Sequence, residues 1–206
     1  MAHKFPIGIQ TFERLRNDGY VYVDKTDLVY QIAHGAVFNF LARPRRFGKT
    51  LNMDMLRTFF EKTEEDTSVY FKDKKIWGCG AKYREYQGKY PVIFITFKDV
   101  KFETWGETFE NIKTIIAAEF RRHSELFESE KCDQYDKEYL HKVISGNASE
   151  VEFSGALLYL SQMLDKHHGI APIIIIDEYD TPIQQGHMRG FYDKVILFMR
   201  NLFYFF

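Results

Sequence analysis

Hydrophobic residues recur at intervals of three and four positions in three long segments of the chain, and this spacing predicts amphipathic helices. We expect the first helix over residues 105–126. The second should run from about Phe153-Ser154, where Ser154 could be the cap, to Gly169, and the third should begin at about Gly190. The apolar stripes are Phe109, Ile112, Ile116 and Phe120 in the first helix, Leu157, Leu160 and Leu164 in the second, and Phe191, Val195, Phe198 and Leu202 in the third.

Short apolar runs predict strands over residues 37–41, 92–97 and 173–176. Further helices are expected over 24–34, 49–60 and 133–144, whereas residues 62–90 are polar and interrupted by glycine, which indicates an irregular segment with short helical pieces. Strands alternate with helices, and the run at 173–176 is apolar throughout, as is typical of parallel strands covered on both faces. The pattern therefore predicts an α/β fold, in which ligands bind at the carboxyl ends of the strands.

Residues 43–50 read Arg-Pro-Arg-Arg-Phe-Gly-Lys-Thr and lie between a predicted strand and a predicted helix. In a phosphate-binding loop at such a turn, backbone N–H groups point at the phosphates, a lysine reaches the β- and γ-phosphates, and a threonine hydroxyl ligates Mg²⁺. Arg43 replaces the usual first glycine of such a loop, and Pro44 restricts the backbone around it. Gly48, where the backbone must approach phosphate closely, is retained, so we expect Lys49 and Thr50 to contact phosphate and metal.

The predicted strand at 173–176 ends in two adjacent carboxylates, Asp177 and Glu178. A Mg²⁺ ion bound to a nucleotide needs an acidic partner, and a second acid can act as the general base for an attacking water. We therefore interpret Asp177 as a metal ligand and Glu178 as the base; the alternative is that Glu178 only solvates the end of the strand. Asp180-Thr181-Pro182 is expected to form a turn in which Asp180 binds local backbone, with a functional role for Asp180 as the alternative.

Two other groups of charged residues allow two interpretations. Arg45 and Arg46 could neutralise phosphate charge or could form a solvated basic edge. His167 and His168 precede Gly169 in the last turn of a predicted helix, where a cation complements the helix dipole, and we prefer this role to metal binding. No Asn-Lys-x-Asp sequence occurs, so guanine specificity has no support.

The composition narrows the class of protein without identifying a ligand. Hydrophobic residues make up 45% and aromatic residues 17% of the 206 residues, which allows a sizeable core in about one domain. The net charge of −1 gives no sign of a basic surface for nucleic acid. Cys79 and Cys132 lack the spacing of a metal site, and we expect reduced thiols in a cytoplasmic protein. No secretory signal is visible, and no apolar run is long enough to cross a membrane.

Taken together, the motifs resemble those of the AAA-ATPase-like proteins common in anaerobic gut bacteria. The resemblance extends over essentially the whole chain. Proteins of that family also have an Arg-Pro pair, here Arg43-Pro44, where other phosphate-binding loops have their first glycine. The residues that carry it are Phe12 to Arg16 with Tyr22-Val23-Asp24-Lys25-Thr26, then Pro44 to Thr50, and Asp177 to Ile183.

The resemblance implies a P-loop three-layer α/β sandwich with a mostly parallel sheet, formed by residues 36–206 after a helical lead-in over 1–35. It implies ATP and Mg²⁺ as cofactors, a Walker A loop with Lys49 on the phosphates, and a Walker B strand. Thr50 and Asp177 would bind the metal, and Lys49 and Glu178 would be catalytic. Hydrolysis would drive a conformational switch that acts on an unidentified protein partner. The nucleotide-binding residues would be Arg45, Arg46, Phe47, Gly48, Lys49, Thr50 and Leu51.

Proteins that this chain resembles are typically longer and often carry a PD-(D/E)XK nuclease-like domain toward the carboxyl end. In ATPases with a catalytic glutamate after the metal aspartate, the strand that follows the Asp-Glu strand lies between it and the P-loop strand and usually carries a polar residue that senses the γ-phosphate. No such strand is predicted before Phe206. We therefore expect residues 1–206 to be an incomplete ATPase core, truncated before the sensor strand, that hydrolyses little ATP alone. The apolar run from Leu202 to Phe206 is expected to favour self-association.

Two functions other than ATP hydrolysis fit the same residues. The chain could be a nucleotide-binding or interaction module without turnover, or it could be a phosphotransferase that acts on a small acceptor. Neither the process that ATP would serve, nor an arginine finger, nor the oligomeric state can be assigned from the residues, and catalysis itself stays a hypothesis at this stage.

Overall fold

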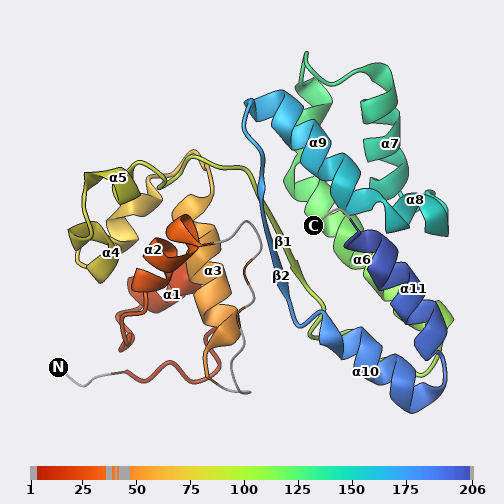
Figure 1. The fold of residues 1–206 in the computed structure, drawn as a ribbon, viewed down its shortest axis with the longest axis horizontal. Coiled ribbons are helices and arrows are strands. Elements are labelled where there is room, and N and C mark those ends of the chain that lie inside the picture. The colour runs from red at the N-terminus through yellow and green to blue at the C-terminus, as the bar shows by residue number, and fades with distance from the viewer. Residues whose placement is uncertain (1–3, 36–38, 40, 42–46, 205–206) are drawn as a thin grey trace. The chain divides into compact units, whose positions relative to one another are not determined.

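A computed structural model describes residues 4–35, 39, 41 and 47–204 of the chain (Figure 1). These residues form two compact units, one within residues 1–92 and the other within residues 93–206. Each unit is described below by itself. The predicted boundary between residues 35 and 36 stays a prediction, and the predicted strand at 37–41 lies almost entirely outside the described residues.

The first unit is helical in the part that the structure describes. Phe71 contacts the rings of Phe12 and Phe59 at centroid distances of 5.2 and 5.0 Å, and all three side chains are fully buried. This aromatic core joins the first helix to the third. The elements are α1 (Phe12–Asn17), α2 (Asp27–His34), α3 (Lys49–Phe60), the 3₁₀-helix η1 (Thr67–Tyr70), α4 (Lys75–Gly78) and α5 (Ala81–Arg84).

The predicted helix over 49–60 is confirmed with both boundaries, and the segment 62–90 is irregular with short helices, as expected. The helix predicted from residue 24 begins later, at Asp27, because residues 24–26 are occupied in contacts described below. It ends at His34 before Gly35, as predicted.

The second unit contains the two strands, apart from Val92, and the helices that follow residue 104 (Figure 1). The strands are parallel neighbours, and the backbone N–H of Phe97 donates to the carbonyl oxygen of Asp177 at 3.0 Å. The α/β class is therefore confirmed, whereas the three-layer sandwich stays a prediction. The elements are β1 (Val92–Thr96), α6 (Trp105–Arg122), the 3₁₀-helix η2 (Ser124–Glu128), α7 (Gln134–Ile144), α8 (Glu150–Ser154), α9 (Ala156–His168), β2 (Ile173–Asp177), α10 (Asp180–Arg189) and α11 (Tyr192–Leu202).

The core of the second unit forms between one face of β1 and the apolar stripes predicted from the sequence. Ile93, Ile95 and Phe97 alternate along the chain at the two-residue period of a strand, and all are buried in this core. The predicted stripe residues that lie in the same core are Ile112, Ile116 and Phe120 of α6, Leu157, Leu160 and Leu164 of α9, and Val195, Phe198 and Leu202 of α11.

Two predicted helices have different boundaries in the structure. The first stops at Arg122 and continues as η2 after His123. The second is divided in two, and Ser154 is not its cap: α8 is capped by Ser149, whose hydroxyl accepts from the N–H of Glu152 at 3.2 Å. The Glu152 carboxylate accepts in return from the N–H of Ser149 at 2.7 Å, which completes a capping box.

The turn predicted at Asp180-Thr181-Pro182 is wrong, because these residues form the first turn of α10. Proline is tolerated there, since the first N–H groups of a helix have no partner within the helix. The Asp180 carboxylate accepts from the side chain of Gln184 at 2.7 Å rather than from local backbone. Close packing of α10 on α11 needs a glycine: a Cβ on Gly186 would lie 2.6 Å from Cγ1 of Val195.

Candidate functional site

Gly48 precedes the helix α3 in a backbone conformation that suits glycine. It is the N-cap of α3, with φ of 72°, and its carbonyl oxygen accepts from the N–H of Asn52 at 3.0 Å. Residues with a side chain rarely adopt a left-handed φ, and no described atom lies within 4 Å of the position a Cβ would take. The left-handed conformation therefore favours glycine at this position.

Lys49 and Thr50 are the first two residues of the 12-residue helix α3, and both are partly exposed. The first turn of α3 contains no acidic residue, so nothing in it would repel an anion. Backbone N–H groups, an ammonium and a hydroxyl together are the donors and the metal ligand that a magnesium-bound phosphate needs. The residues present therefore fit a nucleotide phosphate group.

The structure describes only some of the other residues of the predicted loop. Phe47 is 60% exposed immediately before Gly48, and Leu51 lies in α3 and is partly buried. Arg45 and Arg46 lie outside the described residues, as do Arg43 and Pro44. Their predicted contacts with phosphate stay predictions.

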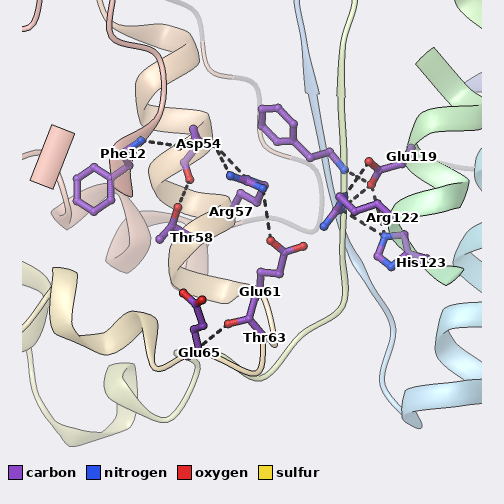
Figure 2. Close-up of polar contacts among 11 residues, drawn as sticks. Phe12, Asp54, Arg57, Thr58, Glu61, Thr63, Glu65, Glu119, Arg122 and His123 are labelled. Atoms are coloured by element: carbon purple, nitrogen blue, oxygen red, sulfur yellow. Dashed lines mark hydrogen bonds and ion pairs between the residues drawn. The ribbon is translucent and has the colours of Figure 1, made fainter. Parts of the chain in front are cut away.

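Asp54 of α3 connects this helix to α1. Its Oδ2 accepts from the backbone N–H of Phe12 at 2.6 Å, and its Oδ1 accepts from Nη2 of Arg57 at 2.8 Å (Figure 2). Arg57 also lies 3.7 Å from the carboxylate of Glu61. Asp54 is buried, and it satisfies an N–H in the first turn of α1 that has no partner within that helix. Asp54 was not predicted from the sequence, because its partner Phe12 lies 42 residues away along the chain.

The Asp24-Lys25-Thr26 sequence of the lead-in has a structural role in the first unit. The Asp24 carboxylate accepts from the N–H of Lys75 at 2.8 Å, and the Thr26 hydroxyl accepts from the N–H of Ile76 at 3.2 Å. Both N–H groups belong to the start of α4, so two lead-in residues cap a helix distant in sequence. Burial would raise the pKa of Asp24, but hydrogen bonds from Thr26 and Lys75 outweigh it and lower that pKa.

Asp177 lies at the carboxyl end of β2 and is fully buried. On the neighbouring strand, the Thr96 hydroxyl donates to Oδ2 of Asp177 at 3.5 Å. The carboxylate is an oxygen ligand of the kind that Mg²⁺ prefers, so its chemistry fits the predicted metal role. Thr96 was not predicted, since no short motif connects it to a residue that lies 81 positions later.

Glu178 is the one non-glycine residue with positive φ in the part of the chain that the structure describes, at 52°. Its carbonyl oxygen accepts from the N–H of Thr181 at 3.0 Å, and its Oε2 accepts from the Thr181 hydroxyl at 3.4 Å. This conformation lets the chain pass from β2 into α10 within three residues and leaves the side chain partly exposed. Strained backbone of this kind is concentrated at functional sites.

The two pairs of predicted catalytic and metal-binding residues lie in different units. Lys49 and Thr50 belong to the first unit, and Asp177 and Glu178 belong to the second. Among the described residues, no group of three or more His, Cys, Asp or Glu side chains could hold a metal ion. Mg²⁺ bound with a nucleotide commonly uses only one or two carboxylates together with phosphate oxygens and water.

A buried charged cluster that the sequence analysis did not identify supports β1. Glu119 of α6 accepts from the backbone N–H of Phe94 at 2.7 Å and from Nη2 of Arg122 at 2.6 Å, and His123 lies 3.5 Å away (Figure 2). Burial would raise the pKa of Glu119, but hydrogen bonds from His123 and Arg122 hold that pKa below its ordinary value. Burial would lower the pKa of His123, but its bonds to Glu119 and Glu125 raise that pKa.

His167 and His168 lie in the last turn of α9, as predicted, and Gly169 ends that helix with φ of 72°. Nδ1 of His167 lies 2.8 Å from the Ser129 hydroxyl, and Nε2 of His168 lies 3.9 Å from the Glu125 carboxylate. These contacts link α9 to the segment around η2. None of the helices in the described ranges is long and apolar enough to span a membrane.

Comparison with known proteins identifies relatives of the chain. A family profile described as predicted AAA-ATPase matches residues 6–206. A protein of Azotobacter chroococcum mcd 1, described as an uncharacterized protein in the vnfD 5′ region, is 50% identical over 62 residues, which cover 30% of this chain. The match spans 12% of that protein's length. No solved structure matches the chain.

Proposed function

Because the chain belongs to the family of predicted AAA-ATPases, we propose that it binds ATP with Mg²⁺ through Gly48, Lys49 and Thr50 and that Asp177 and Glu178 serve its hydrolysis. The observation that carries the proposal is the start of α3. A left-handed glycine leads directly into a lysine and a threonine at the N-terminus of a 12-residue helix without acids in its first turn. That arrangement has the donors that phosphate requires.

Each residue would have a separate task. The backbone N–H groups at the start of α3 and the Lys49 ammonium would bind the phosphates, and Thr50 and Asp177 would hold the metal. The bound Mg²⁺ would offset negative charge on the phosphates. Glu178 would accept a proton from the water whose oxygen bonds to the γ-phosphorus, while the bond to the bridging oxygen of ADP breaks. The strained backbone of Glu178 supports this assignment over simple solvation of a strand end.

The test of nucleotide binding is a calorimetric titration of ATP into the wild type and the Lys49→Ala variant. We expect Lys49→Ala to weaken binding by at least about tenfold, because a charge-assisted contact with phosphate is lost. Lys62→Ala is the matched control, since Lys62 is an exposed lysine of the same unit. Equal ATP affinity in the wild type and Lys49→Ala would refute the assignment of the loop.

Binding alone does not establish catalysis, so phosphate release is the second measurement. Lys49-dependent release of phosphate from ATP would support an ATPase. Lys49-dependent binding without release, in the longest protein that contains this chain, would favour a nucleotide-binding module without turnover. Transfer of the γ-phosphoryl group to an added small acceptor, in place of release, would favour a phosphotransferase.

A further inference from the structure

We propose that Thr96 is a positioning residue for the metal-binding carboxylate: its hydroxyl sets the orientation of Asp177 and thereby strengthens the binding of Mg²⁺ with ATP. This inference rests on the proposed function. It assigns a role to a residue on β1, a strand that contains none of the residues in the nucleotide-binding motifs.

The parallel sheet places Thr96 beside Asp177. The carbonyl oxygen of Asp177 accepts from the N–H of Phe97, the residue that follows Thr96, at 3.0 Å. Ile93 and Ile95 of β1, the following Phe97, and Ile174 and Ile176 of β2 contribute to the core of the second unit. Side chains alternate between the faces of a strand, so Thr96 and Asp177 share the opposite face.

The contact between the two side chains is directional. The Thr96 hydroxyl is 3.5 Å from Oδ2 of Asp177, and the carboxylate is fully buried. A donor on one oxygen restricts the orientation of the carboxylate and so the direction of the other oxygen. Carboxylates that bind metals are commonly held in this way by hydrogen-bond donors, and loss of such a donor typically lowers metal affinity about 10- to 100-fold. Because the contact is long, we expect an effect at or below the lower end of that range.

Thr181 gives a contrast within the same site. Its hydroxyl donates to the adjacent carboxylate, Glu178, at 3.4 Å, and it belongs to α10 rather than to a strand. Each of the two acids therefore has its own threonine. Of these two threonines, Thr96 donates its hydroxyl to Asp177, the proposed metal ligand.

The experiment measures the gain in ATP affinity that Mg²⁺ provides, as the ratio of the dissociation constant in EDTA to that in Mg²⁺, by calorimetry on the full chain. Thr96→Val keeps the shape and strand preference of the side chain but removes the hydroxyl. We expect it to reduce the gain about three- to tenfold without changing affinity in EDTA. Thr96→Ser, which retains the hydroxyl, should restore most of the gain. Thr114→Val is the control for removal of an exposed threonine hydroxyl elsewhere in the unit.

A structural role alone is excluded by a double variant. If Thr96 acts through Asp177, then Thr96→Val should cause no further loss of the gain in an Asp177→Asn background. A wild-type gain in Thr96→Val, or equal losses in Thr96→Val and Thr114→Val, would overturn the inference while leaving nucleotide binding intact. Absence of Lys49-dependent ATP binding in the wild type would instead overturn the proposed function and this inference together.

Discussion

At the scale of single residues, Glu178 is held in a conformation that costs free energy. Its φ of 52° lies in the left-handed region, where the Cβ of an L-residue approaches the following carbonyl oxygen. Glycine would adopt the same turn without this contact, and eight of the described glycines in this chain do have positive φ. A glutamate in this place fits a residue whose side chain is needed for its chemistry.

Replacing Glu178 should separate stability from catalysis. Glu178→Gly should raise the free energy of unfolding by about 0.5–1 kcal/mol, because relief of strain exceeds the added freedom of glycine in the unfolded chain. Glu178→Gln should leave stability nearly unchanged and lower any Lys49-dependent ATP hydrolysis roughly 10²- to 10⁴-fold, since the general base is lost. Urea unfolding and phosphate release measure the two effects. A less stable Glu178→Gly protein would show that the backbone at this position is not strained.

At the scale of elements, α6 is joined to β1 by buried charges as well as by apolar packing. The Glu119 carboxylate accepts from the N–H of Phe94, in the middle of β1, and it also contacts Arg122 and His123 at the end of α6 (Figure 2). His123 also faces Glu125, which His168 of α9 approaches. Loss of one member of such a group leaves buried charges without compensation.

The cluster of Glu119, His123 and Glu125 should make the free energy of unfolding fall both at high pH and at low pH. The pKa of His123 is raised, so its contribution is complete below the ordinary pKa of about 6.5 and is lost as the pH rises through the raised value. The pKa values of Glu119 and Glu125 are lowered, so their contribution is present above the ordinary value of 4.5 and is lost as the pH falls through the lowered values.

His123→Gln tests the alkaline side of this dependence. Between about pH 6 and pH 9, the wild type should lose more stability than His123→Gln, because the variant has no imidazolium to lose. Melting temperatures in a series of buffers measure the difference. His141→Gln, which removes an exposed histidine of α7, is the control and should follow the wild type. Parallel curves for the wild type and His123→Gln would contradict the assigned role.

At the scale of the whole molecule, the proposed function depends on residues from both units. Thr50 is the second residue of α3 in the first unit, and Asp177 ends β2 in the second. The proposal that both hold one Mg²⁺ ion therefore predicts an energetic coupling between them.

A double-mutant cycle provides that measurement. Thr50→Ala and Asp177→Asn should each reduce the Mg²⁺-dependent gain in ATP affinity, by roughly tenfold or more for a direct metal ligand. The double variant should lose much less than the product of the two single losses, because removal of one ligand already weakens the shared ion. Independent, multiplicative losses would show that the two residues do not serve one metal ion.

Much of the local structure was predictable because it depends on residues close together in the chain. The left-handed Gly169 ends α9 as expected, and the stripes of α6, α9 and α11 are buried as their period requires. The helix α10 was missed because Asp-Thr-Pro favours a turn and a helix start alike, and the length of the helix depends on its packing against α11 through Gly186.

The sequence by itself determined the α/β class, the start of α3 at Lys49 and the placement of Asp177 and Glu178 at a strand end, since each follows from a continuous run of residues. Only the tertiary structure decided which side chains support these motifs. Asp54 meets Phe12 across 42 positions, Glu119 meets Phe94 across 25, and Thr96 meets Asp177 across 81. Such contacts form when segments that are distant in the sequence pack together, so the pattern of neighbouring residues does not predict them.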